Sequence, residues 1–127
     1  AADVRIVEKV GRGLVEAVER GVVPYDLIRE YVAAMKEEGA DVIVLGCTHF
    51  PFLQEQIAAA AGPSVRIINP APAVAAQTRR VVDGIRDIPS GLRIREFYST
   101  GDMQVLRRTA MSIYPTLKDC DFHQINI

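Results

Sequence analysis

The sequence predicts an α/β protein in which a parallel sheet is flanked by helices. Segments with the apolar spacing of helices alternate along the chain with short runs of β-branched residues. Glycine or proline separates these segments at most junctions. Strands that alternate with helices form parallel sheets covered by those helices. The 127 residues are enough for one modest domain or for part of a larger protein.

The first segment, residues 3–10, allows two interpretations. Its apolar residues alternate with charged ones, as in a short strand, but they also continue at helical spacing into Leu14. Two glycines in the following turn disfavour a helix, since each costs up to about 1 kcal/mol relative to alanine. We therefore expect a strand to about Glu8, a glycine-containing turn, and a helix from Leu14 that stops at Gly21.

The next elements have clearer signals. A helix with one apolar stripe is expected between Pro24 and Gly39. Residues 42–45, Val-Ile-Val-Leu, form an uninterrupted apolar run that is typical of a strand buried on both faces. Another helix is expected from about Phe50 to Gly62.

The same signals predict the second half of the chain. The expected elements are a buried strand at 64–68, a helix at 71–85, a loop at 89–91, a strand at 92–98, a helix after Asp102 that Pro115 stops, and a final strand at 122–127.

Composition excludes several classes of protein. Fifteen basic and sixteen acidic residues give a net charge of -1, so no electrostatic footprint for nucleic acid or an anionic membrane exists. The apolar stretches are too short to span a bilayer. The two cysteines and two histidines lack metal-ligand spacing, so no metal site is expected. One distant cysteine pair is most simply explained by a reducing, cytoplasmic setting.

The candidate site is the run Gly46-Cys47-Thr48-His49, directly after the strand at 42–45. Ligands of parallel α/β sheets bind at the carboxyl ends of strands, beside helix N-termini that favour a thiolate. His49 can exchange a proton with Cys47, and Gly46 leaves room for a substrate. The alternatives are structural: Cys47 as a small buried apolar residue, Thr48 as a helix N-cap, and His49 as a capping or packing residue.

The run from Leu45 to Leu53, LGCTHFPFL, resembles the signature of glutamate racemases around their second catalytic cysteine. The stretches 13–21, 68–71 and 98–102 agree with that family in order and spacing. The chain departs from the family pattern at three places. These are Phe50, where the family has tyrosine, Asn69, where it commonly has aspartate, and Val10-Gly11, where it often has Ala-Cys-Pro.

This resemblance implies an isomerase that interconverts L- and D-glutamate with no cofactor, pyridoxal phosphate included. Two thiols on opposite sides of the α-carbon exchange its proton, and the D-glutamate supplies bacterial cell-wall peptidoglycan. By position in the motif, Cys47 is one of the two acid/base residues and His49 assists it. Thr48 helps to bind the head group of the amino-acid substrate.

The family's first half is not found in this sequence: its cysteine in an Asn-Thr context, its Asp-Ser pair and its Pro-Tyr-Gly loop. Cys120 is a poor substitute, because two flanking aspartates disfavour its thiolate. The resemblance therefore implies that residues 1–127 are the C-terminal part of a two-domain, flavodoxin-like racemase. Residues from about Ala76 onward are expected to pack with the N-terminal half or with a second subunit, which makes a homo-oligomer the expected state.

Three other functions fit the same residues. The nearest is an aspartate or hydantoin racemase, although His49 directly after Cys47-Thr48 favours glutamate. The second is a non-catalytic module that binds a small carboxylate. The third is a redox or thiol-hydrolase protein that uses Cys47.

Overall fold

A computed structural model describes residues 3–85 and 95–126 of the chain. The chain divides into two compact units, Ala1–Arg86 and Asp87–Ile127, and each unit is described by itself. The loop expected at 89–91 and the first part of the strand expected at 92–98 lie outside the described residues.

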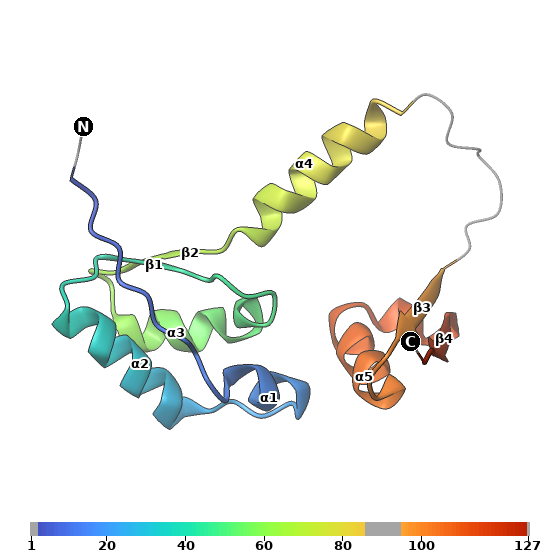
Figure 1. The fold of residues 1–127 in the computed structure, drawn as a ribbon, viewed down its shortest axis with the longest axis horizontal. Coiled ribbons are helices and arrows are strands. Elements are labelled where there is room, and N and C mark those ends of the chain that lie inside the picture. The colour runs from blue at the N-terminus through green and yellow to red at the C-terminus, as the bar shows by residue number, and fades with distance from the viewer. Residues whose placement is uncertain (1–2, 86–94, 127) are drawn as a thin grey trace. The chain divides into compact units, whose positions relative to one another are not determined.

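The first unit contains the helices and the parallel strand pair that the sequence predicts (Figure 1). Its elements are α1 (Leu14–Glu19), α2 (Tyr25–Glu37), β1 (Val42–Val44), the 3-10 helix η1 (Phe50–Leu53), α3 (Gln54–Ala61), β2 (Arg66–Ile68) and α4 (Ala71–Asp83). Strands β1 and β2 pair in parallel, with Ile43 opposite Ile67. The expected parallel α/β arrangement is thus confirmed, with β2 and α4 slightly shorter than predicted.

The core of this unit lies between one face of β1–β2 and the two helices α2 and α3. The apolar stripe of α2 contributes Ile28 and Val32, both buried. The other buried members of the cluster are Leu14, Ile43, Leu45, Leu53, Ile57, Ala61 and Val65. Helix α2 ends as expected at Gly39, whose φ of 85° places it in the left-handed conformation that terminates helices. The core therefore includes residues on both sides of the turn that follows β1.

The prediction that residues 42–45 are buried on both faces is wrong for this chain. Ile43 and Leu45 are buried, but Val42 is 40% exposed and Val44 59% exposed. Alternate side chains of a strand point to opposite faces, and the described helices of this unit bury only one of them. An apolar sheet face is left open as a result.

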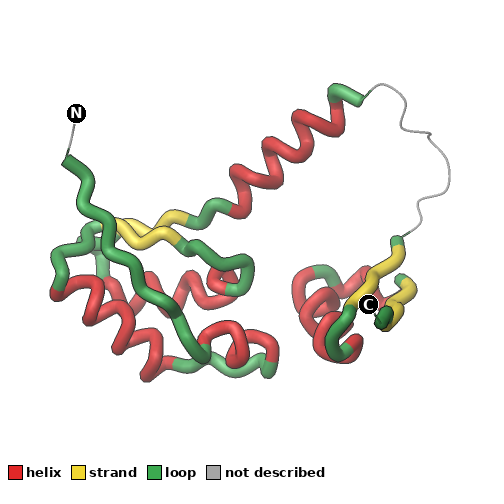
Figure 2. Tube along the Cα trace, in the orientation of Figure 1, coloured by secondary structure: helices red, strands yellow, loops and turns green. Residues whose placement is uncertain are grey.

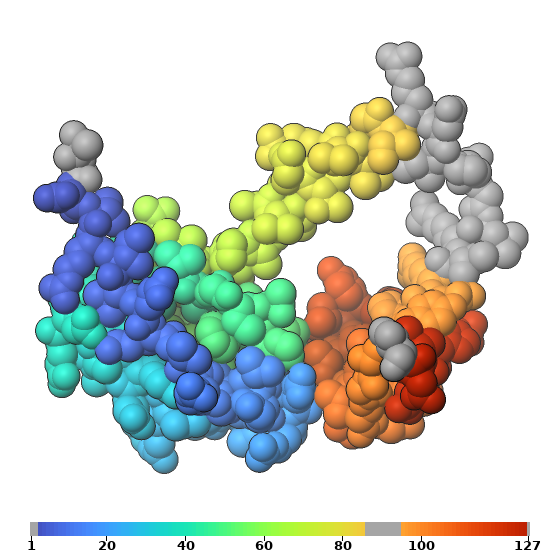
Figure 3. Space-filling model, in the orientation of Figure 1, coloured from blue at the N-terminus to red at the C-terminus, as the bar shows by residue number. Residues whose placement is uncertain are grey.

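The prediction of a strand at residues 3–8 is also wrong. Residues 3–12, here called the strap, run as extended chain without pairing to β1 or β2 (Figure 2). Apolar alternation alone does not make a strand, because the ladder hydrogen bonds need a partner. The strap lies on the surface of the unit (blue in Figure 3), and Val4 and Ile6 are exposed.

Polar contacts fasten the strap to α2 and the residue after it. Lys9 Nζ lies 2.6 Å from Glu38 Oε1, and Arg5 lies 3.4 Å from Glu38 Oε2. The hydroxyl of Tyr31 donates to the carbonyl oxygen of Arg12 at 3.0 Å. The hydrogen bond and charge of Lys9, with help from Arg5, hold the pKa of Glu38 below its ordinary value of 4.5.

We expect the strap to loosen in acid. Because the pKa of Glu38 is lower in the folded chain than in the unfolded chain, the contact stabilises at neutral pH. That stabilisation is lost as the pH falls below 4.5 and through the folded-state pKa. Amide chemical shifts of the strap should then move, and Glu38→Gln should move them already at neutral pH. Glu37→Gln is the control, since that neighbour forms no described ion pair; an equal response to it would contradict the assignment.

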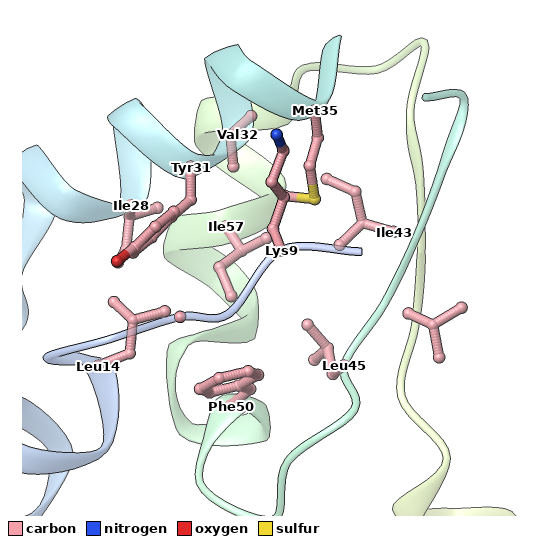
Figure 4. Close-up of a pocket in the computed structure, with 12 residues that line it drawn as sticks. Lys9, Leu14, Ile28, Tyr31, Val32, Met35, Ile43, Leu45, Phe50 and Ile57 are labelled. Carbon is pink, nitrogen blue, oxygen red and sulfur yellow. The ribbon is translucent and has the colours of Figure 1, made fainter. Parts of the chain in front are cut away.

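A small apolar pocket of about 70 Å³ lies beneath the strap (Figure 4). The strap contributes Lys9 and Gly11 to its lining, and Leu14 and Phe50 lie at its lower end. A Cβ atom on Gly11 would come within 2.8 Å of Leu14 Cδ1 and 2.9 Å of Phe50 Cζ. Two positions that depart from the family signature, Gly11 and Phe50, therefore lie against each other, and a side chain at position 11 would displace the ends of the Leu14 and Phe50 side chains.

The second unit is a smaller parallel pair with one helix. Its elements are β3 (Glu96–Ser99), α5 (Met103–Ile113), the 3-10 helix η2 (Pro115–Asp119) and β4 (Asp121–Gln124). Phe97 and Phe122 are paired across the strands and stack at 4.8 Å between ring centroids. Arg107 of α5 lies 5.7 Å from the centroid of the Phe122 ring. Helix α5 thus covers the Phe97–Phe122 face.

The ends of α5 follow the sequence signals in part. Asp102 is the N-cap, and its side chain accepts a hydrogen bond from the backbone N–H of Gln104 at 2.7 Å. Helix α5 ends at Ile113, just before Pro115 as expected, and Pro115 begins η2. None of the helices in the described ranges is long and apolar enough to cross a membrane.

Candidate active site

The candidate site residues occupy the turn between β1 and η1, as the sequence predicts. The ladder of β1 and β2 extends one residue beyond β1, where the backbone N–H of Leu45 donates to the carbonyl oxygen of Ile68 at 2.9 Å. The chain then turns, and Phe50 N–H donates back to the carbonyl oxygen of Cys47 at 3.2 Å. This turn places Cys47 at the carboxyl end of a parallel strand, where α/β proteins bind ligands.

All three predicted site residues meet at one ring nitrogen of His49. Cys47 Sγ lies 4.0 Å from His49 Nδ1, and Thr48 Oγ1 lies 3.4 Å from the same atom. Cys47 and His49 are half-buried, and Thr48 is exposed. The alternative that Thr48 is a helix N-cap is wrong, because His49 holds the N-cap position of η1 and no side chain caps it.

The sequence interpretation missed one contact of this site. Glu19, the last residue of α1, places Oε1 3.3 Å from Nε2 of His49. A carboxylate at the C-terminal end of a helix is unfavourable, because the helix dipole is negative there. That misplaced charge was a signal available in the sequence, but the pairing joins residues thirty positions apart, which local patterns do not show.

Glu19, His49 and Cys47 form a chain of groups suited to moving a proton. The carboxylate favours a proton on Nε2 of His49, which leaves Nδ1 as an acceptor that faces the thiol. A thiol that loses its proton to Nδ1 becomes a thiolate beside an imidazolium, and Glu19 stabilises that positive ring. The arrangement can therefore supply a reactive thiolate or return a proton through the thiol.

The approach to Cys47 is open on the side of Gly46. A Cβ atom built on Gly46 would meet no atom within 4 Å. The side chain of His49 is 29% exposed and that of Glu19 is 45% exposed, so water reaches both. The described residues around Cys47 therefore leave it accessible from this side.

The other cysteine and histidine lie in the second unit. Cys120 is a half-buried free thiol between η2 and β4, and His123 of β4 stacks on Tyr98 with ring centroids 5.0 Å apart. The hydroxyl of Tyr98 donates to Glu96, and this bond raises the pKa of Tyr98. Within residues 3–85 and 95–126, no three His, Cys, Asp or Glu residues are grouped to hold a metal ion.

Glu19→Gln should slow alkylation of Cys47 by iodoacetamide at neutral pH. The amide preserves shape but removes the charge that stabilises the His49 imidazolium. A partly exposed ion pair contributes at most about 1 kcal/mol, so we expect a two- to fivefold slower reaction, roughly. The rate is measured by mass spectrometry in a Cys120→Ser background.

The control for this prediction is Glu16→Gln, which removes an exposed carboxylate from the same helix. Its alkylation rate should match that of the unsubstituted chain. Equal slowing by both substitutions would show a general charge effect and contradict a specific role of Glu19.

Comparison with known proteins identifies the family to which the chain is similar. The model of the Asp/Glu/Hydantoin racemase family matches residues 1–78. A protein named glutamate racemase from Herpetosiphon aurantiacus is 45% identical over 86 residues, which are 65% of this chain and 34% of that protein. A glutamate racemase from Methylococcus capsulatus is 38% identical over 118 residues, which are 88% of this chain and 44% of that protein. The chain thus spans less than half the length of these relatives.

Solved structures show the same fold. The glutamate racemase isoform RacE1 from Bacillus anthracis superposes with a TM-score of 0.72 at 20% identity, over 92% of this chain and 45% of that one. Glutamate racemase from Francisella tularensis, solved in complex with D-glutamate, gives 0.71 at 20% identity, over 91% of this chain and 45% of that one. From the family match, the close relatives and the α/β fold together, it follows that the chain belongs to the Asp/Glu/hydantoin racemase family.

Proposed function

We propose that this chain supplies the second thiol of a glutamate racemase that needs no cofactor. The observation that carries the proposal is the Glu19–His49–Cys47 chain of contacts at the carboxyl end of β1. The relatives described above are named glutamate racemase, and the family model also includes aspartate and hydantoin racemases. Glutamate is therefore the proposed substrate, and an aspartate or hydantoin racemase is the nearest alternative.

The proposed chemistry is a proton exchange at the α-carbon. In one direction the Cys47 thiolate removes the α-proton, which forms the Cys47 thiol and a carbanionic centre. A second thiol on the opposite face then gives its proton to the same carbon, so no proton is gained or lost overall. In the other direction Cys47 is the donor. His49 holds the proton near Sγ, and Thr48 donates its hydroxyl hydrogen to the substrate head group.

The second thiol comes, in this proposal, from an N-terminal racemase half or a second subunit. The apolar surface of the described residues supports a missing partner: Val44 on the open sheet face is exposed, and α4 buries none of its residues. Val74, Val81 and Val82 of α4 are exposed apolar residues. Surface of this kind is typical of an interface. We propose that residues from about Ala76 onward pack against that partner, with homo-oligomerisation as the alternative.

The same proposal gives the protein a cellular role. Interconversion of the glutamate enantiomers supplies D-glutamate for peptidoglycan, as the family resemblance implies. Both cysteines are free thiols, which is consistent with a reducing, cytoplasmic setting.

The experiment is α-proton exchange of L- and D-glutamate in heavy water, followed by NMR. The chain is measured alone and mixed with the N-terminal half of the Methylococcus capsulatus relative. We expect exchange only in the mixture, with no added pyridoxal phosphate.

Two other outcomes count against the proposal. If a folded mixture binds glutamate, seen as thermal stabilisation, but shows no exchange, the chain is a carboxylate-binding module. If aspartate exchanges faster than glutamate, the substrate assignment is wrong while the racemase chemistry stands.

A further inference from the structure

A second set of polar contacts lies where η1 passes into α3, beyond the turn that carries Cys47 and His49. The side-chain amide of Asn69 donates from Nδ2 to Oε1 of Gln54 at 2.9 Å. Its oxygen, Oδ1, accepts the backbone N–H of Ala71 at 3.0 Å. Asn69 follows β2 directly, Gln54 begins α3, and both side chains are half-buried.

The direction of these hydrogen bonds follows from their chemistry. The backbone N–H of Ala71 is a donor only, so the atom of Asn69 that faces it must be the oxygen. The amide nitrogen of Asn69 is then the atom that faces Gln54, and Gln54 must present its own oxygen. One side chain thereby fixes its own orientation and that of its partner.

This pair closes residues 46–53 into a loop that is anchored at both ends. At the first end, Leu45 N–H donates to the carbonyl oxygen of Ile68 at 2.9 Å. At the second end, Gln54 is bound by Asn69, the residue that follows Ile68 and the end of β2. Because Ile68 and Asn69 are neighbours in the sequence, both ends of the loop are fixed to one short stretch of chain.

The loop between these anchors carries the reactive residues. Phe50 N–H donates to the carbonyl oxygen of Cys47 at 3.2 Å, and Phe52 N–H donates to that of His49 at 3.1 Å. These bonds transmit the position of η1 to the backbone of Cys47 and His49. If the Gln54 side chain is released, no described hydrogen bond ties the second end of the loop to the chain after β2. The packing of Leu53 and the backbone bond from Gln54 N–H to the carbonyl oxygen of Pro51 then hold that end.

We propose that Asn69 is a positioning residue that, through Gln54, holds the Cys47 turn in its reactive geometry and ties that turn to the start of α4. The 4.0 Å separation between Cys47 Sγ and His49 Nδ1 is at the outer limit of a sulfur hydrogen bond, so a small displacement of the turn breaks it. The effect on glutamate turnover rests on the proposed function, but the effect on the thiol does not.

The test measures the rate of Cys47 alkylation by iodoacetamide across pH 6 to 9, in a Cys120→Ser background. Gln54→Ala removes the Asn69–Gln54 hydrogen bond, here called the clamp, and leaves the Asn69–Ala71 contact, so it is the decisive variant. We expect it to slow alkylation about two- to tenfold at neutral pH and to displace the pH profile, in line with one lost hydrogen bond. Asn69→Ala should act alike, and the double variant should be no slower than the slower single one, because both remove the same bond.

Two conservative variants should restore the unsubstituted behaviour. Gln54→Glu keeps an oxygen that accepts from the Asn69 amide. Asn69→Asp keeps an oxygen that accepts from the Ala71 N–H, and its second oxygen accepts from the Gln54 amide nitrogen after that amide rotates by half a turn. Circular dichroism and urea unfolding verify that each variant is folded. If Gln54 and Asn69 only supported helix packing, their substitution would lower the urea midpoint but leave the pH dependence of Cys47 alkylation unchanged.

The proposal is overturned if folded Gln54→Ala is alkylated like the unsubstituted chain, or if the two single effects add in the double variant. Its failure is separable from that of the proposed function, because alkylation needs no amino acid. Clamp-dependent alkylation without any glutamate exchange would reject the racemase assignment only. Glutamate exchange that is the same in Gln54→Ala and the unsubstituted chain would reject the clamp only.

Discussion

Cys47→Ala should lower racemisation in both directions by roughly 10²- to 10⁴-fold while leaving proton exchange on one glutamate enantiomer. Each thiol removes the α-proton from its own face, so the loss of Cys47 blocks exchange of the enantiomer that it deprotonates. Positioned acid/base groups contribute roughly 10²- to 10⁴-fold, and we expect a loss of that size. The opposite thiol still exchanges the other enantiomer, without inversion. Deuterium incorporation into each enantiomer, measured in the mixture with the N-terminal half, separates the two cases.

Cys120→Ala is the matched control for this prediction. It removes the other cysteine of the chain, a half-buried free thiol of the second unit, and should leave both exchange rates unchanged. Retention of racemisation in Cys47→Ala, or its loss in Cys120→Ala, would show that the reactive thiol has been misassigned.

Leu53→Ala should produce a large loss of stability close to the site. Leu53 ends η1 and is 2% exposed, among the largest fully buried side chains of the described core. Leucine-to-alanine changes at buried positions cost about 2–5 kcal/mol, since the cavity closes only in part. That is a large share of the roughly 5–15 kcal/mol by which domains are stable. Urea unfolding followed by the amide NMR signals of α2 and β1, which report on the first unit alone, gives the change in its free energy of unfolding.

The neighbouring residue provides the control. Phe52 is 44% exposed on the same 3-10 helix, so Phe52→Ala should change the free energy of unfolding by no more than about 0.5 kcal/mol. If both substitutions destabilise equally, the turn as a whole and not the Leu53 side chain holds η1 in place.

Sequence patterns predicted the helices of the first unit because their signals are local. The apolar stripe of α2 and the glycines after α2 and α3 act within a few residues, and the structure confirms these elements. The errors concern features that need a distant partner. Residues 3–8 have strand-like alternation but no adjacent strand in the described chain, and Val44 has no described cover on its outer face.

The site shows the same division between local and distant signals. The signature around Cys47 placed that residue at the end of β1, next to His49, and the structure has both there. The roles of Cys47, Thr48 and His49 remain predictions. Glu19 was not identified, since its contact with His49 depends on how α1 packs against the turn. Asn69 was noted only as a departure from the family pattern, and its bond to Gln54 became evident only in three dimensions.

The second unit has a consequence for how the chain denatures. Ala110 is the single buried apolar residue that the structure describes in it, whereas the first unit has a cluster of nine. A unit this small, residues 87–127, buries too little apolar surface to be more than marginally stable alone. Its amides should therefore exchange with solvent at lower opening free energies than those of β1 and α2. Denaturation of the isolated chain should not follow a two-state transition, so one unfolding free energy cannot describe both units, and probes must be assigned to one of them.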